Sequence, residues 1–201
     1  MGQPKFNRRH YDTPSHPWQG ERIKAENEVK SKYGLKNKTE IWKAQTILRD
    51  VRGQARALIA RTRNPADEQA VTESRLLIAR LQRSGYLGDN ATLNEVLGLD
   101  LERVLNRRLQ TQVYLKGLAR TPKQARQFVS HGNIKIGDRR VTVPSYVVRR
   151  GEEEQIMIDP TAAIADENHP VRPKAQGFET PAPSLAEAPA PAGATGPGGS
   201  A

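Results

Sequence analysis

The sequence contains no cysteine and only four histidines among its 201 residues. The absence of cysteine excludes disulfides, iron–sulfur clusters and thiolate zinc sites, and it fits a reducing, cytoplasmic setting. The histidines lack the spacing of metal ligands on a helix, so we expect no metal and no other cofactor. Aromatic residues make up 5% and hydrophobic residues 36% of the chain, which leaves room for one or two small domains with modest cores.

Long apolar runs are also missing. No stretch is long enough to span a membrane, and no apolar segment of a secretory signal follows Met1. The sequence shows no Gly-rich phosphate loop, no Ser/His/Asp set and no cluster of paired carboxylates. We therefore expect a protein that is not an enzyme and that has no membrane segment.

Acidic side chains are scarce in the first three-quarters of the chain. Residues 1–150 carry 30 basic and 14 acidic side chains, whereas residues 151–201 carry 2 and 8. Residues 103–150 hold twelve Lys or Arg and a single acid, Asp138. This stretch also has clear helix caps and turns, so its charge belongs to a folded module. A folded surface with that much positive charge needs a polyanion, and we expect RNA.

The segment before the first helix contains three prolines and little periodicity, which predicts an extended arm. Such arms commonly become ordered on RNA, and Tyr11 and Trp18 would then be anchors against protein or bases. The alternative is a terminus that is merely solvated by its charges. The basic residues of the arm that we expect to contact RNA are Lys5, Arg8 and Arg9.

Hydrophobic periodicity between residues 21 and 98 predicts helices and no strands. We expect helices over 21–33, 40–62 and 66–84, the second capped by Thr39, and a short helix opened by a capping box at Thr92. Apolar side chains line one face of the second helix. Its other face is mainly basic, with only Glu40 and Asp50 in opposition, whereas a solvated helix face usually mixes charges of both signs. We expect RNA contact there, and an ordinary solvent-exposed face is the alternative. The residues of that face that we predict to bind RNA are Arg49, Arg52 and Arg56.

The basic module should combine two helices with a small sheet. One helix is expected over 100–116, and a second begins with Thr121 as N-cap and ends at Gly132. The period then changes from 3.6 to 2. Strands are expected over 134–136, 139–143, 146–148 and 155–158, the first two joined by a hairpin turn at Gly137-Asp138. The predicted fold class is therefore α+β, with an N-terminal all-helical domain followed by two helices on a short antiparallel or mixed sheet.

Several motifs in this module resemble the S-four RNA-binding domain, over about residues 103–158. They read RRL at residues 107–109, TPKQARQ at 121–127, HGNI at 131–134 and VPSY at 143–146. The piece KNKTEIWKAQTILRDVRGQARALIA before the module resembles the family of small ribosomal subunit protein S-four, archaeal type. The Gly137-Asp138 turn departs from the usual Asn-Gly of the family. The cysteine zinc cluster frequent in bacterial relatives is absent.

The resemblance implies a structural, primary rRNA-binding protein of the small subunit that nucleates assembly of the subunit body and supports translational accuracy. It also implies 16S-type rRNA as partner, neighbours such as a protein of the S-five type, and a place near the mRNA entry path. In the family, the second helix and the following hairpin clasp folded RNA. The module residues that we predict to contact rRNA are Arg103, Arg107, Arg108, Thr121, Lys123, Gln124, Arg126, Gln127, His131, Lys135, Arg139 and Arg140.

Two other functions use the same domain. An RNA-modifying enzyme would need a catalytic domain, for which the chain leaves no room. A free RNA-binding assembly or rescue factor would be little more than the module, whereas this chain has a long helical region before it. We expect the domain boundaries at 1–102 for the arm and helical region, 103–165 for the module, and 166–201 for a disordered tail rich in proline, alanine and glycine.

Overall fold

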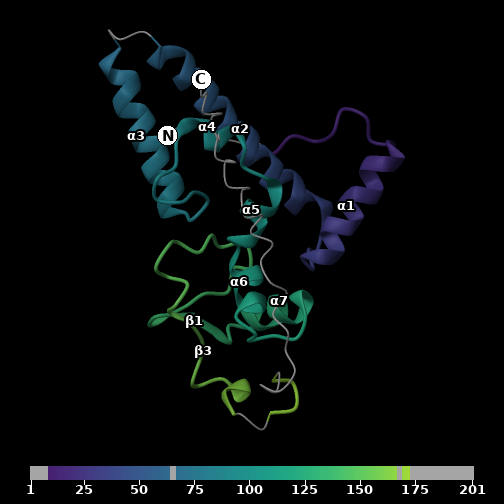
Figure 1. Ribbon diagram of the computed structural model, residues 1–201. Helices are drawn as coiled ribbons and strands as arrows, with labels where there is room; N and C mark the ends of the chain where they lie inside the picture. Colours follow the sequence, from purple (N-terminus) through teal and green to yellow (C-terminus); the bar gives the residue numbers. More distant parts are fainter. Residues whose placement is uncertain (1–8, 64–66, 167–168, 173–201) are drawn as a thin grey trace, which may run out of the picture.

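The computed structural model describes residues 9–63, 67–166 and 169–172. It consists of a helical region and a smaller helix-sheet module, which are drawn one above the other in Figure 1. Each has its own hydrophobic core. One core runs from Tyr33 to Leu105, and the second runs from Leu109 to Ile156. The change of core between Leu105 and Leu109 lies close to the predicted boundary, while the division into domains stays a prediction.

The helical region is built around one long helix, α2 (Lys38–Thr62). The helices α1 (Gly20–Lys32), α3 (Glu68–Arg83) and α4 (Leu93–Leu97) each pack against it. Figure 1 shows α1 and α3 on opposite sides of α2. The predicted apolar stripe of α2 is confirmed, because its buried side chains are Ile41, Ala44, Leu48, Val51, Ala55 and Leu58.

The ends of these helices follow local sequence signals in part. The capping box at Thr92 is confirmed, since Thr92 and Glu95 bond to each other's backbone N–H groups. Asp67 caps α3 by accepting a hydrogen bond from the Ala70 N–H. The predicted Thr39 cap is wrong, because α2 starts at Lys38 and its N-cap is Asn37, which makes no side-chain capping bond.

The predicted helix over 100–116 is wrong as a single element. It is divided into α5 (Leu101–Asn106) and α6 (Leu109–Leu115), and Arg108 between them is extended, with φ −72° and ψ 142°. The backbone at this break pairs with a later segment. The N–H of Leu109 donates to the Tyr146 carbonyl at 2.7 Å, and the N–H of Val148 donates to the Arg107 carbonyl at 2.9 Å. These bonds replace the helical ones.

The second helix of the module, α7 (Pro122–Ser130), begins as predicted. Thr121 caps it through a hydrogen bond from the Gln124 N–H, and Pro122 occupies the first turn. Gly132 follows it with φ +73°, the left-handed conformation that favours glycine. In Figure 1, α6 and α7 lie beside each other next to the sheet.

The sheet is antiparallel, with the order β2 (Arg139–Arg140), β1 (Ile134–Ile136), β3 (Ile156–Ile158). Ile136 pairs with Arg139, so Gly137-Asp138 is a two-residue turn as predicted, and Gly137 has φ +58°. The predicted strand over 146–148 is wrong, because Val147 forms only an isolated bridge with Arg108. β2 is also shorter than the predicted 139–143.

The sheet is followed by a single 3-10 turn, η1 (Ala163–Ala165). The α+β class and the order of helical region and module are confirmed by this architecture. The predicted disordered tail lies almost entirely outside the described residues, as do Lys5 and Arg8 of the arm.

Candidate RNA-binding surface

Glu40 in the first turn of α2 holds two of the predicted RNA-binding arginines. Its carboxylate pairs with Arg108, whose side chain is 8% exposed, and with Arg126 of α7, at 3.0 Å from Arg126 Nη2 to Glu40 Oε1. Gln110 lies beside this cluster and donates from Nε2 to the carbonyls of Tyr33, Gly34 and Pro122 at 2.9–3.0 Å. A largely buried polar network therefore joins the helical region to the module.

The protonation of Glu40 reflects these contacts. Burial alone would raise the pKa of Glu40, but hydrogen bonds from Arg126 and Arg108, together with their charges, outweigh it, so the pKa lies below its ordinary value of 4.5. Glu40 is therefore ionised at neutral pH. Arg108 and Arg126 serve the junction between the two regions, and their contact with RNA stays a prediction.

Arg107 is also engaged within the fold. It pairs with Glu153 and donates from Nη2 to the Val148 carbonyl at 2.8 Å. Its guanidinium lies directly over Gly85, where an added Cβ would approach the Arg107 Cζ to 2.3 Å. Gly85 is in the left-handed region, with φ +70°. Arg107 thus ties the turn after α3 to the loop that precedes β3.

Asp159 neutralises two basic residues of the sheet. Its buried carboxylate lies 3.0 Å from Lys135 Nζ and 3.3 Å from Arg140 Nη2. Hydrogen bonds from the Thr161 N–H and hydroxyl lower the pKa of Asp159 most, and Lys135 lowers it further, so it lies far below its ordinary value. Arg140 nevertheless remains half exposed and lies against Gly132, next to the end of α7.

The start of α7 is covered by the link between α1 and α2. A methyl group at Gly34 would lie 2.9 Å from the backbone nitrogen of Lys123. Both polar atoms of the Gln124 side-chain amide are hydrogen-bonded. Its Oε1 accepts from the Arg120 N–H at 2.7 Å, and its Nε2 donates to the Val171 carbonyl at 2.8 Å. Thr121 and Gln124 therefore shape the helix start, and their predicted contacts with RNA are not tested by these bonds.

The outer face of α7 is different. Lys123, Gln127 and His131 are exposed and recur at four-residue intervals, which places them on one face of the helix. Their side chains have no hydrogen-bond or ion-pair partner among the described residues, and the same holds for Arg103 of α5. Arg139 on β2 is exposed and lies over the Tyr146 ring, 5.8 Å from its centroid.

The basic face of α2 divides in the same way. Arg52 donates to the Leu99 carbonyl and Arg49 pairs with Asp12, so both help to hold neighbouring segments. Arg56 is exposed and has no side-chain partner within the described ranges. Arg9 lies 5.5 Å from the centroid of the Tyr11 ring. The side chains available to a ligand are thus those without a partner in the fold.

No group of three or more His, Asp or Glu side chains within residues 9–63, 67–166 and 169–172 could hold a metal ion. In the same ranges, no helix has the length and apolar character needed to cross a membrane.

The sequence matches known proteins along most of its length. The S4 domain family model matches residues 107–154, which include α6, α7, β1 and β2. The small ribosomal subunit protein uS4 of Picrophilus torridus is 51% identical over 177 residues, covering 88% of this chain and 96% of that protein. The chain belongs to the uS4 family. The uS4 proteins of Methanococcus aeolicus and Halobacterium salinarum are 50% and 48% identical, covering 86% and 88% of this chain and 96% and 99% of their own lengths.

Sequence reasoning did not find the residues that join the two regions of this uS4-family chain. Neither Glu40 nor Gln110 carries a local signal in the sequence that marks it as a junction residue. Lys116 and Arg149 are further exposed basic residues whose side chains have no partner in the described part of the chain, and the sequence does not single them out. Their charge was visible in the sequence, whereas their lack of a partner depends on the fold.

Proposed function

We propose that this chain is a structural component of the small ribosomal subunit that binds its rRNA directly as a primary binding protein. In this role it nucleates assembly of the subunit body and supports translational accuracy. The observation that carries the proposal is that exposed basic and polar side chains on the outer face of α7, and Arg103 on α5, lack partners in the described fold. The names of the relatives, all small-subunit proteins, support the same conclusion.

The chain acts by neutralising RNA phosphates at more than one place. Lys123 contributes from the module, and Arg103 of α5 and Arg56 of α2 contribute from the helical region. Each neutralised phosphate releases condensed counterions, which gives RNA binding its strong dependence on salt. Most such contacts reach the phosphates and sugars, so they fix position and shape more than they read base sequence.

The junction at Glu40 makes these contacts act together. Because Glu40 of α2 holds Arg126 of α7, the two regions keep a fixed angle to each other. Two RNA segments bound by the two regions are then held at that angle as well. A binding protein of this kind brings RNA segments together and needs no catalytic group.

The finer assignments concern location and neighbours. We place the chain in the cytoplasm, in small subunits, near the mRNA entry path and beside a protein of the S-five type. A free assembly or rescue factor is the competing function. The helical region with its own exposed cation, Arg56, favours the subunit protein, because such factors need little beyond the module.

Sedimentation of a cell lysate tests this function. We expect the chain to sediment with the small subunit in a one-to-one ratio and to remain there after a high-salt wash. A chain found mainly at the top of the gradient, or released by the wash from a minor fraction of subunits, would favour the assembly or rescue factor.

A further inference from the structure

Residues 9–19 have no helix or strand of their own, yet they are fixed against α1 and α2. The Tyr11 ring stacks on the Trp42 ring of α2, with centroids 6.3 Å apart and an angle of 29° between the planes. The N–H of Asp12 donates to the Thr46 hydroxyl at 3.1 Å, and the Asp12 carboxylate pairs with Arg49. The arm therefore has a defined course over the two helices.

A second set of bonds fixes the backbone just before Trp18. Arg22 of α1 donates from Nη2 to the His16 carbonyl at 2.8 Å and to the Pro17 carbonyl at 3.0 Å. Pro17 adds its own restriction of φ. Despite this anchoring, the Trp18 side chain is 91% exposed, more than any other large hydrophobic residue of the described chain. The fold thus holds an indole ring in water, where it is available for stacking.

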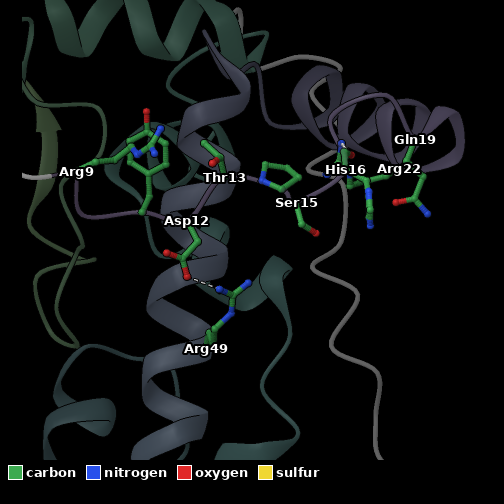
Figure 2. A pocket seen from close by; sticks show the side chains of 10 residues that line it. Arg9, Asp12, Thr13, Ser15, His16, Gln19, Arg22 and Arg49 are labelled. Carbon is green, nitrogen blue, oxygen red and sulfur yellow. Dashed lines mark hydrogen bonds and ion pairs between the residues drawn. The ribbon is translucent and has the colours of Figure 1, made fainter.

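A polar hollow of about 710 Å³ is lined by residues of the arm, of α1 and of α2. Its lining includes His16 and Gln19, which flank Pro17 and Trp18 in the sequence. Arginines reach it from three segments, and Figure 2 shows them as Arg9 of the arm, Arg22 of α1 and Arg49 of α2. Asp12 is the one acid among the described lining residues, and it already pairs with Arg49, while Arg22 pairs with Glu26 of α1. The hollow is therefore suited to an anion.

We propose that Trp18 and this hollow bind an unpaired nucleotide of RNA, with the base stacked on Trp18 and a backbone phosphate in the hollow near Arg9. The proposal deepens the proposed function and rests on it. Base stacking on exposed aromatic rings next to positive charge is how single-stranded RNA is commonly held. Paired RNA would not serve, because the bases of a duplex are already stacked within the helix.

The surroundings of Trp18 favour RNA over a protein partner. A protein docking site is expected to have an apolar, desolvated centre around its aromatic anchor. Here the hollow that His16 and Gln19 help to line is mostly polar or basic, and the other exposed large hydrophobic side chains belong to other elements, such as Leu76 of α3.

The test uses the full chain and an oligouridylate of about eight nucleotides, with an RNA duplex of equal length as control. The chain has two tryptophans, and Trp42 is engaged with Tyr11 and Glu26. We expect the oligouridylate to quench the fluorescence of the wild type and to leave that of Trp18→Phe unchanged. The duplex should quench neither protein.

Affinity provides the second readout, measured by the anisotropy of a labelled oligouridylate. Trp18→Ala should weaken binding by about fivefold or more, whereas Trp18→Phe should keep most of the affinity. Both variants should fold normally, since the side chain is exposed, and Leu76→Ala serves as a control for the loss of an exposed apolar side chain.

The proposal is overturned if the oligouridylate does not quench Trp18, or if Trp18→Ala binds it as tightly as the wild type does. It is also overturned if Trp18→Ala lowers retention in subunits while oligouridylate binding is unchanged, because a protein would then cover Trp18. In each case a wild-type chain that still sediments with small subunits leaves the proposed function intact. A wild-type chain that does not would contradict the proposed function itself.

Discussion

The junction between the helical region and the module gives the sharpest stability prediction. Replacing Glu40 by Gln keeps the size of the side chain and removes the charge that Arg108 and Arg126 share. Arg108 is 7% exposed and has no other acidic partner among the described residues. Removing one member of a buried ion pair leaves the other charge uncompensated, a loss of about 3–5 kcal/mol.

Partial exposure reduces this figure. The side chains of Glu40 and Arg126 are 17% and 25% exposed, so water can reach part of the cluster. We therefore expect a loss of about 3 kcal/mol, at the lower end of that range. For a chain of this size, such a loss lowers Tm by about 6–12 °C. Thermal unfolding followed by circular dichroism would measure it.

The matched control is Glu102→Gln. Glu102 forms an ion pair with Lys32 at 2.7 Å, but both side chains are about half exposed, at 46% and 56%. An exposed pair of this kind contributes less than about 1 kcal/mol. If Glu40→Gln and Glu102→Gln lower Tm equally, the argument that burial of the junction decides its contribution is refuted.

Acid should weaken the junction in the same way. The pKa of Glu40 is depressed in the folded chain, so its stabilising contribution is complete above the ordinary value of 4.5 and is lost as pH falls below it. Consequently the difference in Tm between the wild type and Glu40→Gln should shrink as pH decreases through this range. A difference that is constant with pH would contradict the ionised state assigned to Glu40.

Three further predictions concern other parts of the chain. In Asp159→Asn, Tm should fall less steeply than in the wild type as pH decreases below 3.8, the ordinary pKa of an aspartate. The reason is that the folded chain holds the Asp159 pKa far lower, so protonation of this group destabilises the wild type. Measuring Tm against pH for both proteins would show the difference. Gly34→Ala should destabilise, since the new methyl would meet the backbone at Lys123 and φ is +59°, whereas Gly53→Ala within α2 has open space and should stabilise by about 0.5–1 kcal/mol; chemical denaturation of both variants compares them. A chain truncated after Arg172 should still sediment with small subunits in lysate, because residues 173–201 have the composition of a solubilising extension; loss of the truncated chain from subunits would disprove this.

The sequence predicts the parts of this fold that depend on neighbouring residues. The capping box at Thr92, the Thr121-Pro122 helix start and the two-residue turn at Gly137 are each set within a few residues. The stripe of α2 follows from periodicity alone. The α+β class could be predicted because these local signals agree with one another.

The parts that the sequence does not predict depend on distant partners. The helix break at Arg108 forms because Leu109 bonds to Tyr146, and no local signal marks it. In the same way, Arg108 and Arg126 look like RNA ligands from their charge, yet they meet Glu40 from a helix far earlier in the chain. Charge can be counted in a sequence, whereas its pairing is decided by tertiary packing.

The central claim is that basic side chains without a partner in the fold bind RNA, while paired ones maintain the fold. The most direct measurement is the salt dependence of affinity for small-subunit rRNA, by filter binding, for Lys123→Gln, Arg103→Gln and Arg150→Gln. Arg150 is half exposed like a ligand residue but pairs with Asp89. We expect each of the first two changes to reduce the slope of log affinity against log salt by about one, and Arg150→Gln to leave it unchanged. Equal slopes for Lys123→Gln and the wild type, or an equal reduction by Arg150→Gln, would contradict the claim.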